Sequence, residues 1–462
     1  MGISQDSFAP SSINPFRKRK NPVITLALLG LLLCVSFYLR WISAVETSVN
    51  VPLRADAGDY FMYAYNLKHK HTYSRDQASL RNKESPVKPD AVRSPGYPLF
   101  LTLFVDGLPT EAMLQRIVLF QAVLSSLTVC VSFFLFLAFL DKPLALAAAF
   151  LTALSPHLIV ANSYLLTEPL FCFLLVGTLY GVSFLPSRPS LGLAFFLGLL
   201  LGFGSLVRPI LQYFPVFFSA FLVFHFGWRK GSKLAGLSLL GFILSLSPWI
   251  ARNIQTLGVP GDKTLMINFL HHGMYPDFTY NGMKESRGFP YRYDPRASEI
   301  SRDLPSVLKE ISSRFEKEPI KHLYWFLIGK PVAFWSWNTV QGVGDAFIYP
   351  VSQSPYFRNA LFRRSHHIMH WLHWSLVISG FFGCLMACFP LSRIGVNQNT
   401  LFTARVTSLL LLYFTLIHMV GAPFPRYSFP LRPFLYGLAL FPVQVLEASL
   451  RKFYCAARPN YP

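Results

Sequence analysis

Long apolar stretches alternate with short polar ones along most of the chain, and this pattern predicts helices that cross a membrane. An apolar run of about 18 residues is long enough to cross a ~30 Å hydrocarbon layer as a helix. Ten such runs occur, at approximately residues 22–44, 112–140, 143–161, 164–185, 190–207, 209–227, 234–250, 368–389, 403–421 and 428–447. The predicted fold class is therefore an all-α polytopic membrane protein with about ten transmembrane helices.

Two long polar segments interrupt the apolar runs, at residues 45–111 and 251–367. Within the second segment, the stretch 298–338 has apolar residues at helical spacing and an aromatic, partly basic end. This amphipathic character is typical of helices that lie at a membrane surface. We therefore expect interfacial helices in these two segments.

The distribution of lysine and arginine predicts the orientation of the chain, because short cytoplasmic loops carry an excess of both. If the N-terminus is cytoplasmic, one set of basic residues falls entirely on the cytoplasmic side. The set consists of Arg17, Lys18, Arg19, Lys20, Lys142, Arg188, Arg229, Lys230, Lys233, Arg393, Arg451, Lys452 and Arg458. Both termini are then cytoplasmic, and both long segments lie on the outer face. The first run has no small-residue cleavage site and is predicted to be a retained signal anchor.

The predicted topology divides the chain into five parts. They are a basic cytoplasmic N-terminus (1–21), an N-terminal transmembrane region (22–250) that contains the outer loop 45–111, an outer loop region with amphipathic helices (251–367), C-terminal transmembrane helices (368–447) and a cytoplasmic tail (448–462).

Composition narrows the class of protein. Charged residues make up only 14% of the chain, where an ordinary soluble domain carries roughly 25%. This excludes a disordered chain and disfavours a set of soluble domains. The formal net charge of +20 arises mostly from the cytoplasmic bias, so we expect membrane lipids rather than nucleic acid as partners. Five of the six cysteines lie inside apolar runs, which argues against a disulfide framework.

Six arginines stand close to span ends on the predicted outer side, where the orientation rule does not expect them. They are Arg54, Arg93, Arg208, Arg252, Arg426 and Arg432. A guanidinium group offers a planar fork of donors that matches phosphate oxygens. A cluster of such groups suits the phosphate of a lipid head group. The alternative for any single arginine is that it reaches the membrane surface or pairs with an outer carboxylate such as Asp56, Asp59 or Asp106.

Three carboxylates share the outer side with these arginines. Asp56 and Asp59 open the first outer segment, and Glu168 lies near the outer end of the fourth run. A carboxylate at a membrane helix end costs desolvation energy and tends to mark function. Beside cations, it suits general-base chemistry next to a phosphate leaving group. The alternatives are a helix N-terminal charge for Asp59, an N-cap for Asp56 and an interfacial residue beside Pro169 for Glu168.

Five short motifs resemble those of the GT-C superfamily of glycosyltransferases. They are Asp56 to Leu67 (DAGDYFMYAYNL), Arg93 to Leu101 (RSPGYPLFL), Thr167 to Leu170 (TEPL), Ser247 to Asn253 (SPWIARN) and Pro425 to Pro430 (PRYSFP). They occur in the order typical of the superfamily and span nearly the whole chain. The resemblance is to bacterial relatives of the protein O-mannosyltransferases and of the lipid A aminoarabinose transferases.

The resemblance implies an inverting hexosyl or pentosyl transferase of the cell inner membrane with a periplasmic active site. It implies a polyprenyl-phosphate sugar as the donor and a hydroxyl of a protein, lipid A or another glycan as the acceptor. Asp56 matches the general base and Glu168 the second acidic position. The chain departs from the pattern at Gly58-Asp59, where many relatives have an acidic residue directly after the first Asp, and in having Glu at position 168. Asp59 is therefore an alternative to Asp56 as the base.

The same resemblance implies a binding site for the donor phosphate. Arg93 matches the position whose cation holds that phosphate, and Arg252 and Arg426 match motif arginines near the active cavity. Tyr60 and Tyr97 belong to the matched motifs and are assigned to the same substrate site.

Histidines at helical spacing suggest a metal site as a further hypothesis. His366, His367, His370 and His373 stand at the predicted outer end of the eighth run, and histidines four residues apart can share a metal. The sequence has no His-Glu-x-x-His pattern, and tryptophans alternate with these histidines as in an interfacial belt. We therefore expect no required cofactor, and a divalent metal is not supported.

Two other functions are consistent with part of the pattern. A transporter or lipid flippase would explain the spans, but not two large outer segments with paired carboxylates and arginines. An O-antigen ligase or polymerase would act at the same face on a polyprenyl-diphosphate glycan. These remain the alternatives to the transferase.

Overall fold

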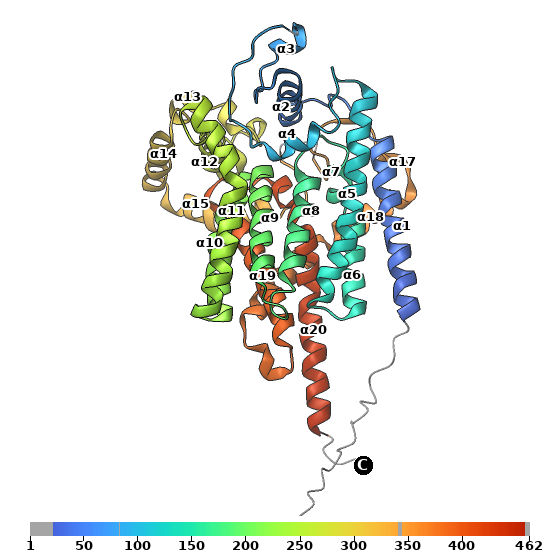
Figure 1. The fold of residues 1–462 in the computed structure, drawn as a ribbon. Helices are drawn as coiled ribbons and strands as arrows, with labels where there is room; N and C mark the ends of the chain where they lie inside the picture. Colours follow the sequence, from blue (N-terminus) through green and yellow to red (C-terminus); the bar gives the residue numbers. More distant parts are fainter. Residues whose placement is uncertain (1–21, 83, 341–343, 458–462) are drawn as a thin grey trace, which may run out of the picture.

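The computed structural model describes residues 22–457 except residue 83 and residues 341–343. The bundle is built from long helices that run side by side (Figure 1). Within the described residues, seven helical stretches are long and apolar enough to cross a membrane, and three shorter ones are also apolar. The all-α polytopic fold class predicted from the sequence is confirmed. The predicted basic N-terminus at residues 1–21 and Arg458 lie outside the described residues.

The apolar helices correspond to the ten predicted runs. They are α1 (Pro22–Glu46), α5 (Glu111–Leu137), α6 (Lys142–Leu154), α8 (Glu168–Val182), α9 (Leu191–Val207), α10 (Phe214–Phe226), α11 (Trp228–Leu257), α18 (Ala360–Cys388), α19 (Gln398–Val420) and α20 (Arg432–Ala457). Short 3-10 segments precede two of them, η1 (Pro209–Tyr213) before α10 and η7 (Pro425–Leu431) before α20.

Prolines correct two of the predicted boundaries. The predicted run 143–161 is divided at Ser155 into α6 and α7 (Pro156–Ala161). The run predicted from residue 164 becomes helical only at Glu168, with Pro169 in the first turn. Proline has no N–H and fits the first turn of a helix, so it favours a new start at both places.

The helices pack in a continuous series. α5 contacts α1, α6 and α8, and α8 contacts α9, which packs along α11. α20 then closes the bundle against α6, α18 and α19. Most buried apolar side chains belong to one core that runs through these helices.

The two outer segments gather at one end of the bundle, at the top of Figure 1. The first contributes α2 (Asp56–Lys70), α3 (Ala78–Arg81) and α4 (Gly96–Leu101). The second contributes α12 (Thr264–Gly273), η2 (Pro276–Phe278), η3 (Lys284–Ser286), η4 (Pro290–Arg292), α13 (Ala297–Ile300), α14 (Leu304–Lys317), α15 (Pro319–Tyr324), η5 (Trp325–Gly329), α16 (Lys330–Phe334) and α17 (Pro355–Arg358). The start of α1 and the end of α20 lie at the opposite end (Figure 1). Which end faces the cytoplasm stays a prediction.

A short antiparallel pair joins the two outer segments. β1 (Ser48–Val49) pairs with β2 (Val351–Gln353), so residues near 350 lie beside the chain that leads into α2. The stretch 298–338 forms the helices that its pattern predicted, and the side chains of Ile320 and Leu323 on α15 are exposed.

Glycines allow α9 and α11 to approach closely. A Cβ atom at Gly198 would lie 1.9 Å from the carbonyl oxygen of Ser238, and one at Gly241 would lie 2.2 Å from that of Phe195. Small residues at such contacts let helix backbones meet in a membrane. This contact fixes α9, whose C-cap residue is Arg208, against α11, which carries Arg252 in its last part.

We predict that Gly198→Ala destabilises the protein by about 1–3 kcal/mol, because the added methyl group overpacks a tight contact. Gly236→Ala in α11 is the matched control, since no atom lies within 4 Å of a Cβ there. That change should be neutral or stabilise by about 1 kcal/mol through helix propensity. The measurement is the temperature at which the detergent-purified protein loses its monodisperse chromatographic peak. Equal shifts for the two variants would contradict the packing argument.

Candidate active site

The carboxylate of Asp56 lies between two arginines from distant parts of the chain. Nη2 of Arg93 donates to Oδ1 of Asp56 at 2.8 Å, and Nη2 of Arg426 donates to Oδ2. Arg93 also donates from Nε and Nη2 to Oδ2 of Asp59, at 3.0 and 2.9 Å. Asp56 and Asp59 lie on the same side of the first turn of α2, so one guanidinium group can bridge both.

The charges of Arg93 and Arg426 determine the protonation state of Asp56. Burial of Asp56 opposes ionisation, but the positive charges of Arg426 and Arg93 outweigh that effect and hold the Asp56 pKa below its usual range. Burial likewise opposes the charge on Arg93, and the negative charge of Asp56 with that of Asp59 raises its pKa above the ordinary value. Asp56 is therefore a carboxylate at neutral pH.

The backbone that leads into α2 is strained. Ala55, directly before Asp56, has a φ of 49° and provides no side-chain cap for the helix. A non-glycine residue with positive φ costs free energy and often marks a functional site. Gly58 meets a separate, steric constraint, because a Cβ atom there would lie 2.6 Å from the carbonyl oxygen of Leu53. This contact explains the glycine inside the first acidic motif.

A second ion pair lies in the protein interior next to the first group. Nη1 of Arg208 is 3.6 Å from Oε1 of Glu168. Among the described residues, neither Oε2 of Glu168 nor Nη1 of Arg208 has a hydrogen-bond partner. The guanidinium carbon of Arg208 lies 5.0 Å from the centre of the Tyr427 ring, and that of Arg426 lies 5.3 Å from it. Tyr427 thus contacts both arginines and connects the two ion pairs.

Two tyrosines contribute to the same group. The Arg93 guanidinium carbon is 5.6 Å from the centre of the Tyr60 ring. Burial raises the pKa of Tyr60, and the charges of Arg93, Asp56, Glu168 and Arg208 act on it as well. Burial raises the pKa of Tyr349 to about 12, with the charges of Asp56 and Arg426 next in importance. The acids and arginines therefore form one electrostatically coupled site, which we call the Asp56 cluster: Asp56, Asp59, Tyr60, Arg93, Glu168, Arg208, Tyr349, Arg426 and Tyr427.

Tyr97 packs against the Asp56 cluster through the ring of Tyr60. Its ring contacts that of Tyr60 edge to face, with centroids 5.1 Å apart, and its hydroxyl donates to Oε1 of Gln121 at 2.7 Å. Gly96 packs against α9, where a Cβ atom would lie 2.7 Å from the carbonyl carbon of Leu206. This close contact brings the loop that carries Arg93 next to the end of α9.

Arg252 binds the backbone of the first outer segment rather than a carboxylate. Nη1 donates to the carbonyl oxygen of Asp90 at 2.9 Å, and Nη2 to that of Tyr73 at 3.0 Å. Its guanidinium group also lies over the rings of Tyr73 and Trp249. The structure therefore places this motif arginine in a different setting from Arg93 and Arg426.

The structure adds three residues to the site that the sequence predicted. Arg208 was one of the six outer arginines, and Tyr427 lies inside the late Arg-Tyr motif, so both had a signal in the sequence. Tyr349 had none, because the pairing of β1 with β2 brings its segment to α2. Of the other outer arginines, Arg54 is exposed, and Arg432 is buried and bound to Nδ1 of His373.

The histidines of α18 have protein partners. Nε2 of His366 lies 2.7 Å from a carboxylate oxygen of Asp345, and Nε2 of His373 lies 2.7 Å from the carbonyl oxygen of Trp335. Trp371, between them in sequence, is 83% exposed, as a belt residue would be. In the part of the chain that the structure describes, no group of three or more His, Cys, Asp or Glu side chains could hold a metal ion.

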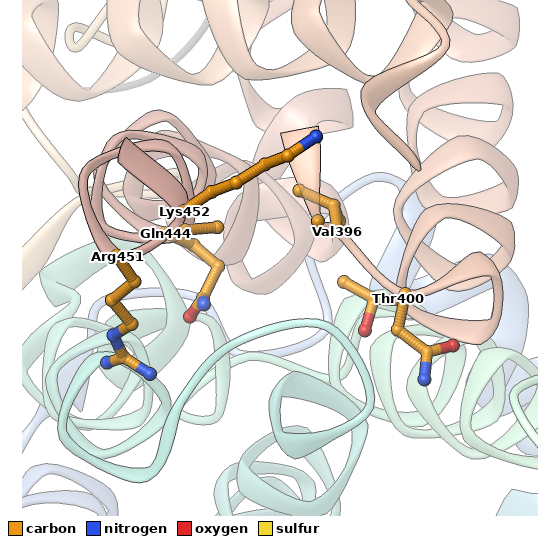
Figure 2. A pocket seen from close by; sticks show the side chains of 8 residues that line it. Val396, Thr400, Gln444, Arg451 and Lys452 are labelled. Carbon is orange, nitrogen blue, oxygen red and sulfur yellow. The ribbon is translucent and has the colours of Figure 1, made fainter. Parts of the chain in front are cut away.

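Two cavities lie at opposite ends of the bundle. A cavity of about 560 Å³ is lined by Asp59 and by residues 74–77 and 88–90. The other, of about 370 Å³, lies between the start of α19 and the end of α20 and is lined by Thr400, Gln444 and Arg451 among others (Figure 2). Only the first borders the Asp56 cluster.

The fold and the site together define an all-α membrane protein with paired carboxylates and arginines at one end of its helical bundle. No protein-family model matches the sequence, and no curated protein matches it. The structure is similar to that of the archaeal oligosaccharyltransferase AglB from Archaeoglobus fulgidus in complex with an inhibitory peptide and a dolichol-phosphate, with a TM-score of 0.50, 14% identity and coverage of 96% of this chain and 52% of that chain. The apo form of the A. fulgidus oligosaccharyltransferase also matches with a TM-score of 0.50, at 13% identity over 97% of this chain and 53% of that chain.

This similarity confirms, at the level of the fold, the GT-C resemblance that the motifs predicted. The chain spans about half the length of the archaeal enzyme that it matches.

We predict that Arg252→Gln loosens the first outer segment, because two backbone carbonyls lose a charged donor. Amide hydrogens of residues 73–92 should exchange faster, as measured by hydrogen–deuterium exchange with mass spectrometry. Arg287→Gln, an exposed change in the other outer segment, is the control. Unchanged exchange in Arg252→Gln would show that these hydrogen bonds do not hold the segment.

Proposed function

We propose that the protein is an inverting glycosyltransferase that moves a sugar from a polyprenyl-phosphate donor to an acceptor hydroxyl. The observation that carries this proposal is the Asp56 carboxylate held between Arg93 and Arg426. Such a group combines a base with the cations that a phosphate leaving group requires. It lies at the end of the bundle where both outer segments gather (Figure 1). We place this end at the periplasmic face of the inner membrane.

The donor phosphate binds at Arg208 and Arg426, with Arg93 completing the site. A lipid-linked donor stays in the bilayer, so its phosphate must be met where the spans end, and both arginines stand at span ends. Among the described residues, Nη1 of Arg208 and Nε of Arg426 have no hydrogen-bond partner, so both can donate to an anion. The similar archaeal structure holds a dolichol-phosphate, which supports a lipid phosphate as the ligand of this fold.

The reaction is a single displacement at the anomeric carbon. The acceptor oxygen forms a bond to that carbon as the bond to the phosphate oxygen breaks, and the electron pair leaves with the lipid phosphate. The proton of the acceptor hydroxyl passes to Asp56. The arginines stabilise the negative charge that develops on the leaving phosphate. Attack from the opposite side inverts the configuration.

Donor binding prepares Asp56 for its role as base. Before the donor binds, both oxygens of Asp56 accept from arginines, which weakens the carboxylate as a base. The incoming phosphate competes for the same N–H groups and withdraws part of that positive charge, so the pKa of Asp56 rises. Asp59 keeps Arg93 in position through Oδ2. We therefore assign the base to Asp56 and a positioning role to Asp59.

Glu168 orients Arg208 toward the phosphate. Its side chain is 4% exposed and carries the only carboxylate that forms an ion pair with Arg208 among the described residues. The long distance of 3.6 Å in this pair leaves room for the guanidinium group to turn toward a stronger anion. Glu168 thus acts on the donor phosphate through Arg208.

We predict that Asp56→Asn lowers turnover by about 100- to 10,000-fold, because the amide cannot accept the proton. Binding of undecaprenyl phosphate should persist, since Arg93 and Arg426 remain. Turnover is measured by mass spectrometry of the glycosylated product, and binding by thermal shift in detergent. Wild-type turnover in Asp56→Asn would show that Asp56 is not the base, whereas a wild-type protein that forms no glycosylated product from a polyprenyl-phosphate sugar would refute the proposed function.

We predict that Arg208→Gln weakens binding of undecaprenyl phosphate by about tenfold or more, because a charged hydrogen bond contributes roughly 1.5–3 kcal/mol. Arg252→Gln is the matched control, since its side chain is bound to backbone carbonyls. Its affinity for the lipid phosphate should equal that of the wild type. The reverse order of the two variants would assign the phosphate to Arg252.

Comparison of cells with and without the gene identifies the sugar and the product. Mass spectrometry of glycans and lipids should reveal one sugar missing from the mutant. Accumulation of an undecorated diphosphate-linked glycan would instead support a ligase or polymerase.

A further inference from the structure

We infer that the cavity beside Asp59 is the acceptor site and that its acceptor is a saccharide hydroxyl. This inference rests on the proposed transferase function and extends it to the class of acceptor. The cavity has a volume of about 560 Å³ and is lined by Asp59 and by residues 74–77 and 88–90. All of these belong to the first outer segment.

The cavity leads directly to the proposed base. Asp59 borders it and is 26% exposed. Both hydrogen bonds from Arg93 go to Oδ2 of Asp59, so Oδ1 is available to a ligand. Asp56 lies one helical turn away and shares Nη2 of Arg93. A hydroxyl that enters beside Asp59 therefore lies within one turn of α2 from the Asp56 carboxylate.

The walls of the cavity are fixed although they contain little regular structure. Nδ2 of Asn66, a fully buried side chain, donates to the carbonyl oxygens of Ser74 and Asp76 at 2.8 and 2.9 Å. The hydroxyl of Ser74 donates to the carbonyl oxygen of Lys88. Arg252 holds the carbonyl of Asp90 from α11. Side chains from outside thus preorganise these walls, as a binding site requires.

These hydrogen bonds also disfavour a peptide as the acceptor. An extended peptide binds through main-chain groups of a free strand edge. Here the carbonyl oxygens of Ser74, Asp76, Lys88 and Asp90 already accept from protein side chains. One of the two lone pairs of each of these carbonyls is therefore already in use, which leaves fewer acceptors for the main chain of a peptide.

The lining instead matches a polyhydroxyl ligand. Arg75, Gln77 and Lys88 offer exposed side-chain donors, and the carboxylates of Asp59 and Asp76 offer acceptors. A sugar hydroxyl both donates and accepts, so it can use both kinds of group. Pro89 is the one apolar residue of this lining, so an acyl chain would bury almost no apolar surface there. Arg252 then acts as a positioning residue for the acceptor site.

The class of acceptor is tested with the full-length protein in lipid nanodiscs. Cells that lack the gene supply the unmodified acceptor fraction, and the donor fraction is added after treatment of the acceptor. Periodate, which cleaves vicinal diols of sugars, should abolish transfer detected by mass spectrometry. Proteinase K should leave transfer intact. Loss after proteinase K, or transfer that survives periodate, would overturn the inference.

Variants test the location of the site. Gln77→Trp fills the cavity from an exposed position and should lower acceptor turnover by about tenfold, while binding of undecaprenyl phosphate stays at the wild-type level. Arg81→Ala, exposed on α3 in the same segment, is the control and should be fully active. Thermal unfolding of both variants shows that they are folded.

Asp56→Asn separates this inference from the proposed function. If Asp56→Asn is inactive while Gln77→Trp turns over like the wild type, the acceptor site is elsewhere and the transferase stands. If Asp56→Asn is active, the assignment of the base to Asp56 is wrong, and if the wild-type protein forms no glycosylated product, the proposed function itself is wrong.

Discussion

The ion pairs of Asp56 are the interaction on which the site depends. A carboxylate that is mostly buried must be paired, because removing one partner leaves an uncompensated charge. Arg93 precedes α4, and Arg426 lies in η7, 370 residues from Asp56, so this requirement joins the first outer segment to the last part of the bundle. The pairing is also reversible, since a phosphate can replace the carboxylate at the same guanidinium groups. The interaction that organises the site is thus the one that a donor would exchange.

The surrounding structure holds these charges by close backbone contacts. Gly58 lies against Leu53, and Gly96 lies against the end of α9. Neither position has room for a side chain, and each belongs to a motif that was recognised for its charged residues. Each motif therefore contains both a charged residue and the glycine whose backbone contact positions it, and the two are near neighbours in the chain.

The sequence predicted the membrane fold and the occurrence of carboxylates and arginines on one side of it, because long apolar runs and misplaced charges are local signals. Pairing between them was only the alternative to a phosphate site. It could not assign the arginines individually. Arg252 and Arg426 stand in similar motifs, yet one binds backbone carbonyls and the other Asp56. The partner of an arginine depends on loops that fold over it, which periodicity does not describe. The sequence could not predict Tyr349 as a site residue for the same reason, because the pairing of β1 with β2 brings it to the site.

The glycine contact between α9 and α11 has a consequence for the chemistry at the surface. Arg208 follows the last residue of α9, and Arg252 lies in the last part of α11. The contact at Gly198 and Gly241 therefore sets the spacing between the arginine that we assign to the lipid phosphate and the arginine that holds the walls of the proposed acceptor site. Under the proposed function, a substitution at this contact would change how the two substrates are aligned, although it lies far from any reactive group.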